Sequence, residues 1–196
     1  MKKRNILKIP TLILAILAVI FGYLDFKKIQ AYVSNQPFSY CRSGQLIAAA
    51  NWEGATGALA GTIKITNKNL HPCILDSTPE ISIRNQEGIS MPVSQIKMQC
   101  KIPQPVILKY KTASNVFFVW RNWCVEKSSE PINLFIKLPH NGEIVIAPAI
   151  DSNGKPLSDY PRCDNPESSS TISVSPFLQN QKTCDLVFLQ KYAGRE

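Results

Sequence analysis

Three glycines, Gly54, Gly57 and Gly61, lie within eight residues of the largely apolar stretch NWEGATGALAG. Glycines at this density can form a loop that holds a phosphate, or they can let a strand bend and pack closely against its neighbours. A phosphate-binding loop needs G-x-x-x-x-G-K-[ST] before a helix, and a dinucleotide-binding loop needs G-x-G-x-x-G opening a helix. Neither pattern is present, because Thr62 and Ile63 follow Gly61 in a strand-like segment. The stretch therefore favours a structural role, in which glycine permits a bulge or a positive φ.

Six cysteines are spread widely along the chain: Cys41, Cys73, Cys100, Cys124, Cys163 and Cys184. No C-x-x-C pair is present, so the sequence indicates neither a thioredoxin-type redox site nor a zinc ribbon. An even number of widely spaced cysteines is typical of disulfides formed in an oxidising compartment. Six cysteines allow fifteen pairings, so the count alone leaves the connectivity open.

Catalytic and metal-binding patterns are scarce. His71 and His140 lie in loop-like sequence without a second histidine or a carboxylate at ligand spacing, so no metal and no cofactor is expected. The nucleophile motifs G-x-S-x-G and S-x-x-K are absent, and the carboxylates are scattered singly. We therefore expect that the chain is not an enzyme. One alternative is a hydrolase, which a deep pocket joining His140 or His71 to a serine and an aspartate would indicate.

The most distinctive stretch is FFVWRNWC, which ends at Cys124. Two tryptophans beside a cysteine could form a platform on which sugars or bases stack. The sequence favours a core position for Trp120. It leaves two interpretations of Trp123 at the strand's end, as a core residue or, with Arg121, as part of a binding surface.

A second candidate surface consists of four lysines within fifteen residues: Lys97, Lys101, Lys109 and Lys111. They could bind an anionic polymer such as wall teichoic acid or extracellular DNA. They could also form a solvated strand edge, where lysines prevent pairing with another chain. The net charge of +8 adds little, because residues 1–28 hold six lysines and arginines against one aspartate. No nucleic-acid partner is expected.

The N-terminal charges belong to a membrane signal. Residues 1–8 contain three lysines and one arginine, and an uncharged run follows over residues 9–24. As a helix this run would span about 24 Å, slightly less than a hydrocarbon core of about 30 Å. No small-x-small cleavage site follows it, which favours an uncleaved single-pass signal anchor in a bacterial cytoplasmic membrane. The basic cluster keeps residues 1–8 in the cytoplasm and sends the rest outside.

After a polar spacer over residues 25–37, short apolar segments alternate with turns, and no amphipathic helix of useful length is present. Strands are predicted over 61–66, 80–84, 89–93, 106–108, 116–120, 132–138, 143–147 and 171–175. The segment 116–120 is apolar on both faces, which predicts a central strand covered on both sides. The fold class is therefore all-β. Residues 38–178 are predicted to form an antiparallel immunoglobulin-like β-sandwich behind the single transmembrane helix, followed by a tail over 179–196 tied by Cys184.

The stretches GATGALAGTIKITNKN, FFVWRNWC and PRCD, with the closing SVSPF, resemble a bacterial family, the domain of unknown function numbered four-two-three-two. Its members are exported β-sandwich modules, and the likeness covers residues 41–177. The resemblance implies bridges Cys41–Cys73 and Cys124–Cys163, and we expect the remaining Cys100 and Cys184 to pair with each other. It implies no catalytic residues, since the family has no established activity.

The sequence thus predicts a membrane-anchored, extracytoplasmic, non-catalytic binding or structural module of the bacterial cell envelope. Residues 9–24 would contact the membrane, and an envelope polymer or another envelope protein would be the partner. An envelope hydrolase and an anionic-polymer-binding module are the alternatives. Neither the ligand nor the oligomeric state follows from the sequence.

Overall fold

The computed structural model describes residues 38–55, 57–100, 105–127, 130–150, 154–156 and 158–179. These residues belong to a compact unit that begins at Phe38. Apart from one 3-10 turn, η1 (Ser43–Gln45), the regular elements described are β-strands, so the expectation of an all-β fold is confirmed for this part of the chain. No helix within it is long and apolar enough to cross a membrane. The predicted anchor at residues 9–24 lies outside the described residues.

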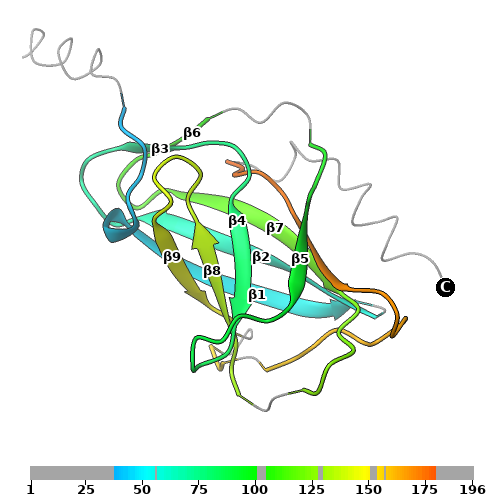
Figure 1. The fold of residues 1–196 in the computed structure, drawn as a ribbon. Helices are drawn as coiled ribbons and strands as arrows, with labels where there is room; N and C mark the ends of the chain where they lie inside the picture. Colours follow the sequence, from blue (N-terminus) through cyan, green and yellow to red (C-terminus); the bar gives the residue numbers. More distant parts are fainter. Residues whose placement is uncertain are drawn as a thin grey trace, which may run out of the picture. The chain divides into compact units, whose positions relative to one another are not determined.

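The described strands are β1 (Leu46–Ala55), β2 (Ala58–Asn67), β3 (Cys73–Leu75), β4 (Glu80–Arg84), β5 (Val93–Lys97), β6 (Val106–Leu108), β7 (Ala113–Arg121), β8 (Asn133–Lys137), β9 (Ile144–Pro148) and β10 (Ser170–Val174). They form a five-stranded sheet in the order β1-β2-β7-β10-β5, a three-stranded sheet β4-β8-β9 and a two-stranded sheet β3-β6. Figure 1 shows the three-stranded sheet drawn across the face of the five-stranded sheet. Buried side chains of both belong to one hydrophobic cluster, so the core lies between them.

The centre of the larger sheet is β7, which pairs antiparallel with β2 on one side and β10 on the other. Every side chain from Val116 to Trp120 is buried, which confirms the predicted central strand. The indole of Trp120 is fully buried, and its Nε1 donates a hydrogen bond to Ser170 Oγ at 2.8 Å. The core position expected for Trp120 is confirmed, and its polar atom is paired there.

The glycine-rich stretch forms the hairpin between β1 and β2, in which Ala55 pairs with Ala58. Gly57 in the turn has a φ of 83°, which glycine adopts without a steric penalty. Gly61 permits close packing, because a Cβ there would meet the backbone oxygen of Asn51 and lie 2.6 Å from Phe118 Cζ. The structural interpretation of these two glycines is confirmed.

One part of the predicted topology is wrong. The strand expected at residues 89–93 is replaced by β5, which begins at Val93, and the N–H of Met91 bonds to the carbonyl oxygen of Ile83. β5 pairs parallel with β10, so the sheet is not antiparallel throughout. No hairpin joins these two strands, because β6 to β9 lie between them in the chain. Only a tight hairpin would force the antiparallel direction.

Two disulfides staple the domain. Cys41 is bonded to Cys73 and Cys124 to Cys163, which confirms both pairings that the family resemblance implies. The expected bridge between Cys100 and Cys184 involves Cys184, which lies outside the described residues. Because disulfides form and persist in oxidising compartments, the two bridges indicate an oxidising, extracytoplasmic environment.

Candidate functional site

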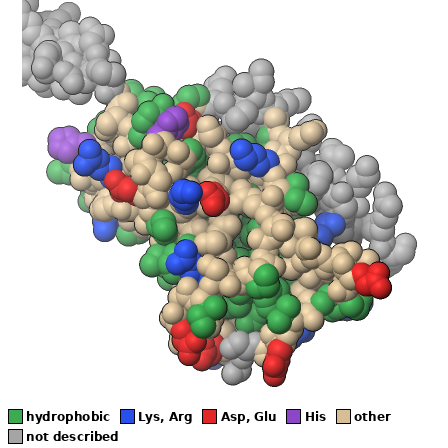
Figure 2. All heavy atoms as spheres, viewed as in Figure 1, with side chains coloured by type: hydrophobic (Ala, Val, Ile, Leu, Met, Phe, Trp, Pro, Cys, Tyr) green, Lys and Arg blue, Asp and Glu red, His purple; other side chains and the backbone are tan. Residues whose placement is uncertain are grey.

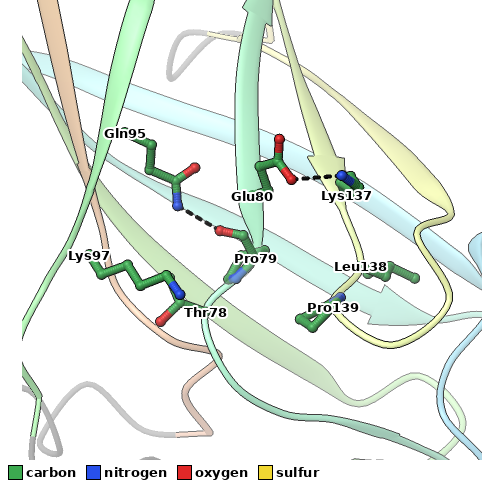
Figure 3. A pocket seen from close by; sticks show the side chains of 8 residues that line it. All are labelled: Thr78, Pro79, Glu80, Gln95, Lys97, Lys137, Leu138 and Pro139. Carbon is green, nitrogen blue, oxygen red and sulfur yellow. Dashed lines mark hydrogen bonds and ion pairs between the residues drawn. The ribbon is translucent and has the colours of Figure 1, made fainter.

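A pocket of about 380 Å³ opens between β4, β5 and the end of β8 (Figure 3). Two ammonium groups, a carboxylate, a carboxamide and a hydroxyl are grouped around three apolar side chains. The lining residues are Thr78, Pro79, Glu80, Gln95, Lys97, Lys137, Leu138 and Pro139. Small-molecule sites are usually apolar hollows on which a few polar groups converge.

Gln95 fixes the wall between β4 and β5. Its Oε1 accepts a hydrogen bond from the N–H of Ile81 at 2.6 Å, and its Nε2 donates to the carbonyl oxygen of Pro79 at 2.8 Å. The start of β4 pairs with β8 on one side, and on the side that faces β5 it finds hydrogen-bond partners in a side chain instead of a second strand. Because both ends of the carboxamide are used, Gln95 positions the wall and leaves ligand contacts to the charged residues.

The charges of the pocket are unbalanced. Lys137 Nζ lies 2.8 Å from Glu80 Oε2, and their side chains are 51% and 69% exposed, so solvent screens this ion pair. Lys97 pairs with no carboxylate in the described part of the chain, and Figure 3 shows its side chain extending toward Thr78. Two ammonium groups face one carboxylate, so the pocket favours an anionic ligand.

A smaller hollow of about 10 Å³ adjoins this pocket, and Leu138 and Pro139 line both. It contains a cluster of three side chains. His140 Nε2 lies 2.6 Å from Asp76 Oδ1, and the ring of Tyr40 stacks on the imidazole with 3.7 Å between centroids and 14° between planes. The cluster thus combines an imidazole, an orienting carboxylate and an aromatic cover.

The turn that carries His140 is fastened to the segment before β1. Asn141 Nδ2 donates to the carbonyl oxygen of Cys41 at 3.0 Å. Glu143 Oε2 accepts hydrogen bonds from the hydroxyl of Ser43 at 2.8 Å and from its N–H at 2.6 Å. These bonds hold the pKa of Glu143 below its ordinary value, and the bond from the Ser43 hydroxyl has the largest effect. The Cys41–Cys73 bridge anchors the same segment to β3.

A strained residue separates the two hollows. Ser77 has a φ of 62°, which is uncommon for a residue with a Cβ. Its neighbours Asp76 and Thr78 line the smaller and the larger hollow respectively. The N–H of Phe177 donates to the carbonyl oxygen of Ser77 at 3.1 Å, which holds this turn in place. Backbone strain of this kind persists only where the surroundings fix it, and it concentrates at functional sites.

The structure places the predicted aromatic surface inside the protein. Trp123 is 4% exposed and packs edge-on against Trp120 at 5.6 Å between ring centroids, so it offers no stacking platform. Asn122, with a left-handed φ of 58°, follows the end of β7, and the next side chain, Trp123, belongs to the hydrophobic core cluster. Arg121 is half-buried at the end of β7, where its carbonyl oxygen accepts a hydrogen bond from Ser170 Oγ. The interpretation of Trp123 as part of a binding surface is therefore wrong.

The predicted lysine set does not gather in one place. Lys97 aligns through Val174 with the middle of β7, whereas Lys109 and Lys111 lie in the turn that precedes β7. Lys101 lies outside the described residues. Figure 2 shows basic side chains scattered singly over the face in view. The companion of Lys97 is Lys137, which sequence reasoning missed because no local spacing connects them.

Within the part of the chain that the structure describes, the features that would indicate a hydrolase or a metal centre are not found. The hollow beside His140 and Asp76 is shallow, and no serine lines it. Among the described residues, no group of three histidine, cysteine, aspartate or glutamate side chains could hold a metal ion.

Comparison with known proteins adds a distant similarity. The chain is 27% identical over 166 residues to the serine/threonine kinase YeaG of Escherichia coli strain K12 and to YeaG of strain O157:H7. The alignment covers 80% of this chain and 25% of the kinase, so the chain spans about a quarter of the length of these curated relatives. No family model and no solved structure matches the chain.

This similarity contradicts the expectation of a non-catalytic binding or structural module and the expectation that the chain is not an enzyme, because the relative is a kinase. The glycines of this chain do not indicate phosphoryl transfer, since they form a hairpin and open no helix. Side chains in the described residues are the other candidates for contacts to a phosphate. The ammonium groups of Lys97 and Lys137 are the ones that the larger pocket offers.

Proposed function

We propose that this chain takes part in phosphoryl transfer, with the pocket around Lys97 and Lys137 holding the phosphate groups of a phosphoanhydride. The observation that carries the proposal is the convergence of two ammonium groups, from β5 and β8, on a hollow of about 380 Å³. Small-molecule sites commonly measure about 300–1,000 Å³. The likeness to a protein named as a serine/threonine kinase supports the chemistry.

Each charged group has a role in this proposal. Lys97 supplies a cation that no described carboxylate neutralises, and Lys137 supplies a second cation by shifting from Glu80 toward the phosphate. The hydroxyl of Thr78 lines the same hollow and adds a hydrogen-bond donor. Catalysis of phosphoryl transfer consists largely of positioning and of stabilising negative charge on the phosphate oxygens, and these groups supply both.

We also propose the finer features of architecture and location. The two facing sheets form an immunoglobulin-like β-sandwich, as expected from the resemblance of this sequence to the exported modules of the domain of unknown function four-two-three-two. Residues 9–24 anchor it in a bacterial cytoplasmic membrane with the domain outside, and an envelope protein or polymer is its partner. The basic cluster in residues 1–8 supports this orientation. The Cys41–Cys73 and Cys124–Cys163 bridges support the oxidising side.

Equilibrium binding of ATP and of inorganic pyrophosphate to the purified full chain, with its disulfides intact, tests the proposed function. We expect Lys97→Ala to weaken binding of at least one of these probes about tenfold or more, which corresponds to about 1.4 kcal/mol. Lys109→Ala is the matched control, because it removes the same charge outside the pocket. Equal weakening by both variants, or no binding of either probe, would overturn the proposal.

A further inference from the structure

A nucleophile lies directly beside the proposed phosphate pocket. Leu138 and Pro139 line the larger pocket and the smaller hollow alike, and His140 follows them in the chain. Its side chain is 40% exposed, whereas that of Asp76 is 21% exposed. The imidazole is thus open to a reagent bound next to it, while the carboxylate behind it is more enclosed.

The contacts of the ring determine which nitrogen is reactive. Nε2 of His140 lies 2.6 Å from Asp76 Oδ1, so in the neutral ring Nε2 carries the proton and donates it to the carboxylate. Nδ1 then keeps its in-plane lone pair, and it makes no hydrogen bond to any residue described in the structure. Tyr40 stacks on a face of the ring and fixes the ring plane, and 40% of the His140 side chain stays exposed beside it.

We propose that His140 accepts a phosphoryl group at Nδ1 from a phosphoanhydride held by Lys97 and Lys137. This inference rests on the proposed function of the pocket. The Nδ1 lone pair attacks the terminal phosphorus and forms an N–P bond. The bond from that phosphorus to the bridging oxygen breaks, and the leaving phosphate departs with its electron pair. No redox change occurs, and the product is a phosphohistidine.

Asp76 is a positioning residue in this step. Phosphorylation of Nδ1 leaves Nε2 protonated, so the ring becomes positively charged as the bond forms. The carboxylate at 2.6 Å stabilises this charge and holds the reactive tautomer. Ser77, with its positive φ, lies between Asp76, which contacts the histidine, and Thr78, which lines the neighbouring pocket.

The test is labelling of the full chain with terminally ³²P-labelled ATP and with labelled pyrophosphate. We expect a label that acid removes and base does not, because an N–P bond is acid-labile and phosphoserine or phosphothreonine is not. Both His140→Ala and His140→Asn should abolish the label, and His71→Ala, which removes the other histidine, should retain it. Unfolding curves of all variants establish that they are folded.

The role of Asp76 has its own readout. Asp76→Asn should slow labelling about tenfold, by analogy with the loss of the carboxylate partner of a metal-bound histidine, without changing the donor concentration that gives half the maximal rate. Lys97→Ala should raise that concentration instead. A merely structural role for Asp76 would change both quantities together.

The failures of the two proposals are distinguishable. If a probe binds and Lys97→Ala weakens it, but no acid-labile label forms with either donor, the pocket function stands and the role of His140 is overturned. An acid-stable label that His140→Ala retains also overturns the role of His140 and leaves phosphoryl transfer in place. If neither probe binds, both proposals fail.

Discussion

The side chain of Asn122 ties the end of β7 to the loop that contains residues 164–168. Its Oδ1 accepts hydrogen bonds from the N–H groups of Asp164 at 3.0 Å and Asn165 at 2.9 Å. Its Nδ2 donates to the carbonyl oxygens of Asn165 at 2.8 Å and Ser168 at 2.6 Å. One carboxamide thus satisfies four backbone groups next to the Cys124–Cys163 bridge. We predict that replacing it destabilises the domain measurably.

Two terms set the magnitude, and two substitutions separate them. Each net hydrogen bond contributes about 0.5–1.5 kcal/mol, and exposure places these four at the low end, so Asn122→Ala, which loses them and keeps a Cβ at a φ of 58°, should cost about 2 kcal/mol. Asn122→Gly loses the same bonds but also removes the Cβ, which relieves about 1 kcal/mol at this φ. We therefore expect Asn122→Gly to cost about 1 kcal/mol.

Urea unfolding of the full chain with intact disulfides measures both losses as free energies of unfolding. Lys111→Gly is the matched control, because Lys111 has a φ of 59° and its side chain makes no hydrogen bond to any residue that the structure describes; its ammonium group lies over the ring of Tyr110. This variant should be neutral or slightly stabilised. A free energy of unfolding for Asn122→Ala within about 0.5 kcal/mol of that of the natural chain would refute the reasoning, since that is the ordinary scatter of surface substitutions.

Three further predictions follow from contacts described above. Gly61→Ala should destabilise the protein by about 3 kcal/mol or prevent folding, because the new Cβ would lie 2.6 Å from a core phenylalanine ring. Gly44→Ala is the control: its new Cβ would meet nothing within 4 Å, so it should be neutral in the same urea titration. Trp120→Phe should cost about 2–3 kcal/mol by thermal unfolding, since it loses a buried hydrogen bond and ring volume; a loss below about 0.5 kcal/mol would contradict the core assignment. Ser43→Ala should raise the pKa of Glu143 toward its ordinary value in a carbon-detected NMR titration. Because folding lowers this pKa, the carboxylate stabilises the fold above its unfolded pKa and loses that contribution as pH falls through the folded value; an unchanged pKa in the variant would show that the hydroxyl is not the cause.

The strands that the sequence predicts best are those whose side chains alternate and are β-branched. β4 (Glu80–Arg84) and β6 (Val106–Leu108) coincide with predicted segments. β1 was missed, because its central run of three alanines has a low strand propensity, and only its ten-residue register with β2 makes it a strand. Local patterns therefore reveal a strand when its own side chains favour one, and fail when a neighbour imposes it.

The candidate site was predictable only in fragments. Lys97 was named from its lysine-rich surroundings, but its companion Lys137 lies on β8 and reaches the pocket through the pairing of β8 with β4. Asp76 and His140 meet in the same way, across 64 positions of sequence. Nothing in local spacing connects these partners, because the sheet architecture creates each contact.

The parallel pairing of β5 with β10 imposes an order in time. β5 is synthesised well before β10, and until β10 is present β5 lacks the strand that pairs with it in the sheet. β7 also pairs with β10, so until β10 is present one edge of its continuous apolar run lacks a neighbouring strand. Closing contacts between segments so distant in the chain is slow, and an open apolar edge recruits other strands. This protein is therefore most prone to aggregation in the period after β7 and before β10 has been synthesised.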